Sequence, residues 1–225
     1  MSQLEPVLAA ADEAAEAVMM RKASLGESPM VMADIYQAAV NMAIWQRSLS
    51  PALQALAERF VTQAPDFSRA MTVSPELAYS RLSDELGKGF EPLAEDMAEL
   101  IDMFSELFEL SRVGLRIGVL GQAMCPKFHV DKVPCRLITT YQGVATQWLT
   151  HEAVDRRKLG AGSAELSDSE SGLYLRASDI QTLHAGDVAL LKGERWMGNE
   201  GAGLVHRSPQ ITEQQPRLLM TLDFA

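Results

Sequence analysis

The chain has 225 residues, a length that suits one large domain or a compact domain with a helical extension. Its residues are 47% hydrophobic and 22% charged, which are ordinary globular values and exclude a disordered chain. Thirty Asp and Glu residues against twenty Lys and Arg give a net charge of −10 without a compensating basic stripe. Nucleic acid is therefore not an expected partner.

The apolar stretches and the cysteine content bear on the cellular compartment. Charge or glycine interrupts every apolar stretch well before the roughly 18 residues that a membrane-spanning helix needs, so we expect no membrane partner. The N-terminus carries acids where a secretory signal carries a basic region. Two cysteines are too few for a disulfide framework. These features together predict a cytoplasmic protein.

Residues 1–110 show the periodicity and the boundary signals of helices. Asp34 is expected to cap a first helix that runs through Val40, Ile44 and Trp45 toward Leu49. The region as a whole is predicted to be helical.

Three later segments carry stronger helix signals. Ser50-Pro51 and Ser74-Pro75 each place an N-cap residue before a proline at the first helical position, and Gly87 suits the end of the second of these helices. The clearest helix runs roughly from Glu91 to Leu110, with an apolar stripe opposite a row of acids. Such a row fits either a carboxylate metal site or a solvated face, and the lack of a Glu-x-x-His pair favours the solvated face.

After residue 111 the hydrophobic period falls from about 3.6 to 2, which is typical of strands. The polar, Gly- and Ser-rich stretch at residues 155–171 predicts a mobile loop. Eight short strands predict two four-stranded sheets in a jelly roll. These strands are Arg112–Leu120, Lys127–Asp131, Cys135–Gln142, Ala145–Leu149, Gly172–Arg176, Asp187–Lys192, Gly203–His206 and Arg217–Phe224.

The strand-rich half also contains a candidate metal site. In His129-Val130-Asp131 the imidazole and the carboxylate are two residues apart, so both point to one face of a strand. His206, at the end of a later strand, is placed to supply a third ligand. Two imidazoles and one carboxylate leave the open positions that a non-haem Fe(II) centre needs.

Two arginines after this motif are candidates for holding an anion. Arg217 lies eleven residues after His206, on the next predicted strand, from which its guanidinium can grip a carboxylate bidentately. Arg207, directly after His206, is the alternative, or else a surface residue.

The order of His-x-Asp, a Gly-Asp turn into a strand, a distal His-Arg and a final-strand Arg resembles the Fe(II)/2-oxoglutarate-dependent dioxygenases over residues 112–225. The resemblance implies an α+β fold in which the helical region 1–110 packs on a cupin-like double-stranded β-helix, or jelly roll, of residues 111–225. It also implies that His129, Asp131 and His206 bind iron. Arg217 would pair with the distal carboxylate of 2-oxoglutarate, and Tyr141 would hydrogen-bond the same group.

A second resemblance is closer. Phe128-His129-x-Asp131, the motif over residues 136–143, Trp148 and Ile44-Trp45-Gln46-Arg47 are similar to a bacterial domain of unknown function. Members of that family tend to be encoded near zinc-linked CobW-type GTPases, an association that implies metal handling.

The two cysteines favour a different metal. Cys125, His129, Asp131 and Cys135 all have odd numbers, so an undistorted strand would point them to one face, where thiolates and imidazole suit zinc. An extended chain separates residues 125 and 135 by on the order of 30 Å, so a shared site also needs bends at the flanking prolines.

Three functions follow as hypotheses. The first is an Fe(II)/2-oxoglutarate-dependent oxygenase, a hydroxylase that acts on an unknown small-molecule or macromolecular substrate. The second is a non-catalytic zinc-binding or metal-homeostasis protein that uses the same cup. The third is a cupin-like isomerase or lyase that uses another divalent metal. The amphipathic helices suit a homodimer interface as well as a core, so the oligomeric state stays open.

Overall fold

The structure of the chain is a computed structural model that describes residues 20–211 and 215–225. Its three α-helices are α2 (Pro51–Gln63), α3 (Pro75–Leu86) and α4 (Glu91–Leu107), and a 3-10 helix, η1, covers Pro29–Tyr36. Four shorter 3-10 turns follow at His151–Ala153 (η2), Arg156–Lys158 (η3), Gly160–Ser163 (η4) and Ala177–Asp179 (η5). The strands are β1 (Lys22–Gly26), β2 (Val40–Trp45), β3 (Ser68–Val73), β4 (Val113–Leu120), β5 (Cys135–Gln142), β6 (Gln147–Leu149), β7 (Ile180–Thr182), β8 (Val188–Lys192), β9 (Val205–Arg207) and β10 (Arg217–Phe224).

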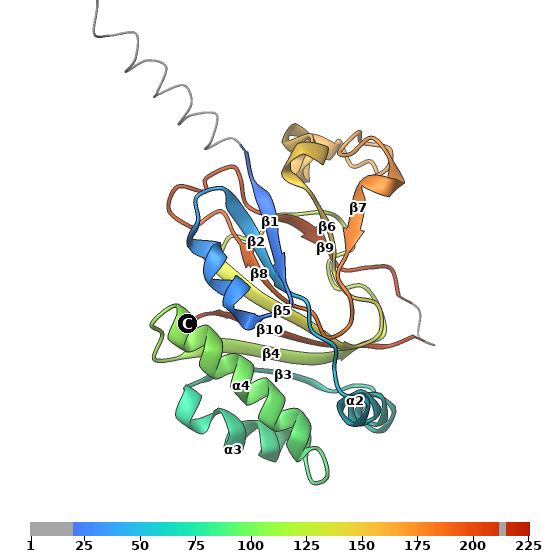
Figure 1. Cartoon of the computed structure of the whole chain (residues 1–225). Helices are drawn as coiled ribbons and strands as arrows, with labels where there is room; N and C mark the ends of the chain where they lie inside the picture. The colour runs from blue at the N-terminus through green and yellow to red at the C-terminus, as the bar shows by residue number, and fades with distance from the viewer. Residues whose placement is uncertain (1–19, 212–214) are drawn as a thin grey trace, which may run out of the picture.

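Two sheets of unequal size organise these strands. The large sheet has seven strands in the order β1-β2-β8-β5-β10-β4-β3, and the small sheet has three in the order β7-β6-β9. Helices α2, α3 and α4 gather on one side of the large sheet, and the small sheet lies at the opposite end of the molecule (Figure 1). The two sheets enclose a cup, and the candidate site lies inside it.

The alternation of side chains along the strands sends each residue to one of two layers. On β4 the odd-numbered Val113, Leu115 and Ile117 join the main core with helices α2, α3 and α4. On β5 the even-numbered Ile138 instead joins a second core with Trp148 and the other residues between the sheets. The cup is therefore lined by the even positions of β4 and β5.

The predicted helix from Asp34 to Leu49 is wrong. Residues 29–36 form η1, and Val40–Trp45 is strand β2, which pairs with β1 on one side and β8 on the other. All but one of the β2 residues are buried, and all except Asn41 are apolar, so the alternation that marks a half-buried strand is lost. Region 1–110 is thus not purely helical, because it supplies β1, β2 and β3 to the large sheet.

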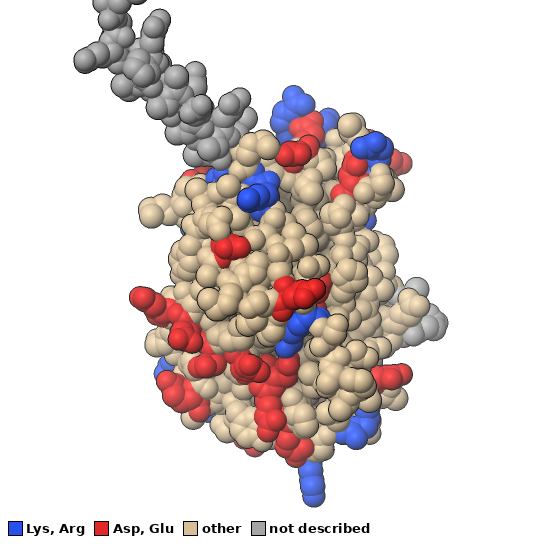
Figure 2. Space-filling model, viewed as in Figure 1, with Lys and Arg blue, Asp and Glu red and all other residues tan. Residues whose placement is uncertain are grey.

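The later helices agree well with their signals. Ser50 accepts a hydrogen bond from the Leu53 backbone N–H at the start of α2, and Gly87 ends α3 with a positive φ of 85°. Helix α4 ends at Leu107, three residues before the predicted end, and its apolar stripe is buried. Most of its carboxylates form a solvated face (Figure 2), because Glu95, Glu99 and Asp102 are exposed, whereas Asp96 is partly buried.

The predicted jelly roll needs two corrections. Strands Cys135–Gln142 and Arg217–Phe224 have the predicted bounds, but Gly172–Arg176 forms turns, and Lys127–Asp131 contributes only an isolated bridge between His129 and His206. The sheets have seven and three strands rather than four each, because the first half of the chain adds three strands and β7 was not predicted. No helix among residues 20–211 and 215–225 is long and apolar enough to cross a membrane.

Candidate metal centre and anion pocket

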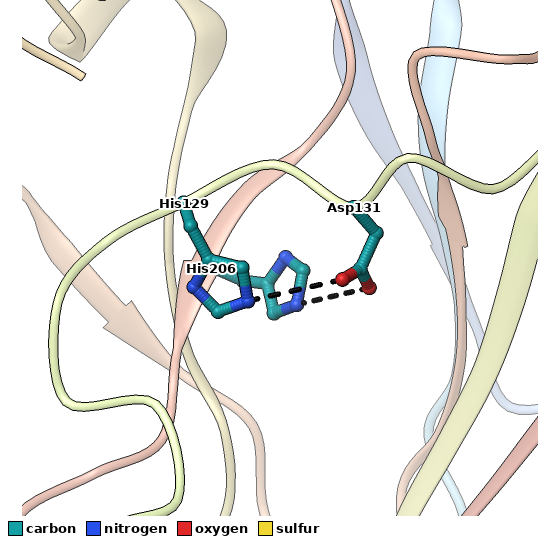
Figure 3. A group of neighbouring side chains, drawn as sticks. All are labelled: His129, Asp131 and His206. Atoms are coloured by element: carbon teal, nitrogen blue, oxygen red, sulfur yellow. Dashed lines mark ion pairs between the residues drawn. The ribbon is translucent and has the colours of Figure 1, made fainter. Parts of the chain in front are cut away.

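Three predicted ligands meet at the mouth of the cup. His129 and Asp131 lie on the segment between β4 and β5, and His206 lies on β9. Two backbone hydrogen bonds of 3.0 Å, exchanged between His129 and His206, hold the two chain segments side by side. The three side chains point toward one another (Figure 3). A strand contact between distant segments therefore assembles the group.

The donor atoms of this group lie close enough to share one ion. One potential ligand atom from each residue lies within 4.8 Å of the others. Asp131 Oδ2 is 3.4 Å from His206 Nε2, and Asp131 Oδ1 is 3.8 Å from His129 Nε2. His206 is buried, whereas His129 and Asp131 are partly exposed, so the group has a wall on one side and an opening on the other.

Backbone carbonyls fix the tautomers of both histidines. His129 Nδ1 lies 3.0 Å from the Lys127 carbonyl oxygen, and His206 Nδ1 lies 3.3 Å from the Leu204 carbonyl oxygen. A carbonyl oxygen only accepts, so each Nδ1 carries the hydrogen and each Nε2 keeps a lone pair. Both lone pairs are directed toward Asp131, which is how metal-binding histidines are usually oriented. The chemistry and orientation of the donors thus fit a divalent cation.

The charges of the group also suit a metal. Burial and the charge of His206 lower the pKa of His129, so its imidazole is neutral at pH 7. Burial alone would raise the pKa of Asp131, but the interactions with His206 and Arg136 outweigh burial and bring that pKa to about 2. One carboxylate and a neutral imidazole are therefore already in their metal-binding protonation states.

Arg136 on β5 fixes the carboxylate of Asp131. Its Nη1 donates to Asp131 Oδ2 at 2.7 Å, while its Nε and Nη2 each donate to Asp223 on β10 at 2.8 Å. The guanidinium therefore bridges two carboxylates, and among the described residues no side chain or backbone group donates a hydrogen bond to Asp131 Oδ1. Arg136 leaves that oxygen as the natural ligand for an ion.

A cavity of about 170 Å³ opens beside the three ligands. His129 and His206 form one part of its wall, and Arg217, Thr146 and Leu219 form another. The volume is enough for a small organic acid next to an ion.

Arg217 is a buried cation in this cavity. Only 1% of the residue is exposed, and burial lowers its pKa to about 10. Its Nε and Nη2 donate to Thr140 Oγ1, and its Nη2 also donates to Thr146 Oγ1 at 2.6 Å. No carboxylate among the described residues pairs with it. A buried charge normally has a counterion, so this site is built to receive an anion.

The structure corrects the prediction for Tyr141. Its side chain lies on the opposite face of β5 from the cavity, and its hydroxyl donates to Asp96 Oδ2 at 2.5 Å. Asp96 in turn pairs with Arg47 at 2.8 Å. Burial and the charge of Asp96 raise the pKa of Tyr141, which keeps the hydroxyl protonated. Tyr141 therefore ties β5 to helix α4 and does not contact a cavity ligand.

The structure also removes the basis for a shared cysteine site. Cys135 is fully buried in the core on the helix side of the sheet, where burial raises the pKa of its thiol. Cys125 is exposed and lines the cavity. The chain turns between them, so their odd numbers do not place them on one face. Neither cysteine joins the cluster of His129, Asp131 and His206.

Arg207 and the two remaining histidines, His151 and His184, have their partners outside the metal and Arg217 sites. Arg207 donates to Gln147 and, at 3.0 Å, to Asp168, so it is not the buried cation that Arg217 is. His184 is 83% exposed beside Asp187. His151 contacts Arg156 at 3.2 Å.

Sequence reasoning missed three residues that shape the site. Thr140 and Thr146 hold Arg217, and Arg136 holds Asp131. The signal for two of them was present, since Arg136 and Thr140 share the even face of β5 while Tyr141 is on the odd face. Thr146 lies outside any strand, and nothing in its local sequence marks it.

Comparison with solved structures identifies the fold. The structure is similar to that of dioxygenase for auxin oxidation 1 from Arabidopsis thaliana, solved as a complex with 2-oxoglutarate, with a TM-score of 0.50, 11% identity and coverage of 91% of this chain and 92% of that one. The structure of the dioxygenase for auxin oxidation in rice matches with a TM-score of 0.49 and 12% identity, over 91% of this chain and 82% of that one. A Pseudomonas putida prolyl-4-hydroxylase matches with a TM-score of 0.42 and 12% identity, over 87% of this chain and 96% of that one. The first match shows a fold shared with a 2-oxoglutarate-binding dioxygenase.

The sequence comparison supplies the family. The chain belongs to the family described as "Protein of unknown function (DUF1826)", which matches residues 26–223. No curated protein sequence matches the chain.

Proposed function

We propose that this protein is an Fe(II)/2-oxoglutarate-dependent oxygenase. The observation that carries the proposal is one cavity with two kinds of site: a His-Asp-His group whose ligand atoms lie within 4.8 Å of one another, and a buried arginine that pairs with no carboxylate of the described residues. The first suits a divalent metal and the second suits a carboxylate. The shared fold with a 2-oxoglutarate-binding dioxygenase supports the same assignment.

The proposed roles follow from the contacts. His129, Asp131 and His206 would hold the metal, with Arg136 keeping Asp131 in place. Arg217, steadied by Thr140 and Thr146, would pair with the distal carboxylate of 2-oxoglutarate. A bound Fe(II) would supply the redox chemistry by which O₂ oxidises 2-oxoglutarate, with loss of CO₂, together with a second substrate.

The protein itself contributes binding and orientation. The Lys127 and Leu204 carbonyls accept from Nδ1 of the two rings, which orients each Nε2 toward the proposed metal position. Arg217 neutralises the carboxylate in a site with little water, where the charge interaction is strong. Cytoplasmic location, the bacterial source and the link to zinc-associated GTPases stay predictions from the sequence.

An anaerobic titration tests this function. Fe(II) is added to metal-free protein, then 2-oxoglutarate, and the weak visible charge-transfer band of the ternary complex is measured. We expect the band in the wild type and in His184→Ala, which changes an exposed histidine outside the group. We expect no band in His206→Ala.

The two halves of the site separate in a second variant. Arg217→Met should bind Fe(II) with unchanged affinity but lose 2-oxoglutarate affinity at least about 100-fold, because a charge-assisted bidentate contact is removed. Wild-type protein that binds Fe(II) but not 2-oxoglutarate would contradict the oxygenase function and leave a metal-binding protein.

A further inference from the structure

The second substrate of the proposed oxygenase is the open question, and the lining of the cavity bears on it. Five arginines line the cavity, and the described lining residues include no Asp, Glu or Lys: Arg69, Arg116, Arg136, Arg207 and Arg217. The whole chain carries a net charge of −10, so this concentration of cations runs against the composition of the protein. A cleft lined by one sign of charge attracts ligands of the other sign.

Most of these arginines are occupied by carboxylates of the protein. Arg207 pairs with Asp168, and Arg69 pairs with Glu85. Arg136 bridges Asp131 and Asp223. Arg217 belongs to the proposed 2-oxoglutarate site. These four are therefore engaged or assigned, which leaves the fifth.

Arg116 on β4 is the cation that remains available. Its Nη1 lies 3.3 Å from Asp223 Oδ2, but Arg136 already donates to both oxygens of that carboxylate at 2.8 Å. The side chain of Arg116 is 61% exposed. Arg116 thus makes the third and longest hydrogen bond to this carboxylate, and an incoming anion can replace it at little cost.

The floor of the cavity beside Arg116 is formed by Gly118, Ser68 and Ala70 and has only small side chains. Gly118 follows two residues later on the same face of β4, and its cross-strand partner on β3 is Ser68, while Ala70 is the partner of Arg116. Gly118, Ser68 and Ala70 all line the cavity. Small residues on two neighbouring strands leave room above the sheet.

The fold does not require glycine at position 118. Its φ is outside the positive range, and an added Cβ would have its nearest neighbours at 3.6 Å and 3.7 Å, which are ordinary contacts. Glycine inside a strand is destabilising relative to alanine, because it loses more backbone entropy on folding. Such a glycine often marks a place where a ligand approaches the backbone.

Arg116 is also separate from the proposed 2-oxoglutarate site. Thr221 on β10 pairs with Arg116, and Arg217 lies four residues earlier on the same strand. At about 3.4 Å per residue, the backbone positions of Arg116 and Arg217 are about 14 Å apart along the strand direction. One small acid does not span both, so two anions can bind at once.

We propose that the second substrate is a small molecule with a carboxylate or phosphate group that pairs with Arg116 while its body lies over the Gly118 floor. This inference rests on the proposed oxygenase function and names the substrate class of that same cavity. The oxyanion anchors one end of the molecule at β4, and the rest extends toward His129 and His206.

Fluorine NMR with matched fragments tests the inference. The probes are 4-fluorobenzoate, 4-fluorophenyl phosphate and neutral 4-fluorobenzamide, added to zinc-loaded protein with and without saturating 2-oxoglutarate. Zinc keeps the samples free of turnover. We expect the anions to bind in the presence of 2-oxoglutarate and the amide to bind at least about tenfold more weakly. The stronger of the two anions identifies the group.

Three variants locate the binding. Arg116→Gln should weaken anion binding about tenfold. Arg116→Lys should bind more tightly than Arg116→Gln but less tightly than the wild type, because lysine keeps the positive charge without the bidentate geometry of the guanidinium. Gly118→Val should weaken all three probes by filling the floor. Arg81→Gln, an exposed arginine outside the cavity lining, is the control and should bind like wild type.

Each outcome decides the matter. Equal binding of the amide and the anions, binding to none of the probes, or an Arg116→Gln variant equal to Arg81→Gln would overturn the inference. Loss of 2-oxoglutarate binding in the same wild-type samples would overturn the proposed function instead. The anion comparison without 2-oxoglutarate still tests Arg116 in that case.

Discussion

Single contacts around Asp131 and Arg217 decide whether the cavity can hold its proposed ligands. The residues that bind are held by others: Arg136 orients Asp131, backbone carbonyls orient both histidines, and two threonines orient Arg217. Such supporting contacts commonly change metal affinity or activity by 10–100-fold when removed.

Arg136→Gln should weaken Fe(II) or Co(II) binding by about 10–100-fold, because Asp131 loses the donor that fixes its carboxylate. Anaerobic metal titration measures the effect. Arg81→Gln, which removes an exposed arginine, serves as the control. An Arg136→Gln affinity equal to wild type would mean that the carboxylate is positioned without this contact.

Arg217→Met should also change stability in the absence of ligands. A buried guanidinium whose partners among the described residues are two hydroxyls is costly. Without 2-oxoglutarate, the free energy of unfolding of the variant, measured with urea, should therefore be about 1–2 kcal/mol higher than that of the wild type. Added metal and 2-oxoglutarate should stabilise the wild type and not the variant. A variant that is clearly less stable than the wild type would show that the threonine contacts alone offset burial.

At the scale of single helices and strands, stability depends on contacts such as the hydrogen bond at the start of a helix. Two helices begin with the same Ser-Pro pair, yet they differ in structure. The Ser50 side chain accepts a hydrogen bond from the Leu53 backbone N–H, whereas Ser74 forms no side-chain cap bond with α3.

Ser50→Ala should therefore lower the free energy of unfolding by about 1 kcal/mol, the usual value of an N-cap hydrogen bond. Ser74→Ala is the matched variant and should lower it by less. Urea unfolding followed by circular dichroism gives both values. Equal losses would show that the two serines cap their helices alike in solution.

Strand β8 carries a buried lysine that makes stability depend on pH. Burial lowers the pKa of Lys192 to about 8, although its ammonium donates to the Gln37 carbonyl and lies over the Trp196 ring. The unfolded chain then binds more protons between pH 8 and about 10.5, so the contribution of Lys192 to the free energy of unfolding rises with pH there.

The difference between the wild type and Lys192→Met isolates the contribution of Lys192 to the free energy of unfolding. The opposite contribution of the buried Cys135 thiol cancels, because both proteins contain it. Across that range the wild type should gain about 2 kcal/mol relative to the variant. Urea unfolding at a series of pH values measures the difference. A constant difference would show that the ring and carbonyl contacts keep the pKa near its ordinary value.

For the whole molecule, the large sheet joins both halves of the sequence. Strands β1, β2 and β3 come from the first half, yet they flank β8 and β4 in one sheet. The main core likewise combines α2, α3 and α4 with residues of β4, β5 and β10. Residues from both sides of position 110 therefore share one core.

Residues 111–225 expressed alone should not fold cooperatively, because removal of the helices exposes the apolar face of β4 and β10. Urea unfolding and NMR dispersion measure this, with the full chain as control. A cooperative transition in the fragment would show that the strand-rich half is a domain in its own right.

The sequence by itself determined local features. N-cap serines, the glycine after α3 and the period-2 pattern of β4 and β10 depend on neighbours along the chain, so the pattern was enough. It failed at Val40–Trp45, since a strand buried on both faces has no alternation to read. Motif order marked His129, Asp131, His206 and Arg217 as candidates.

Only the tertiary structure decided which candidates meet. The bridge between His129 and His206 spans 77 residues of chain, and it is a pairing between strands that no local pattern encodes. The face of β5 separates Tyr141 from the cavity and gives Thr140 to Arg217. A turn of the chain removes Cys135 from the metal site. Distances between remote residues depend on how sheets pack, so the geometry of the site belongs to the fold.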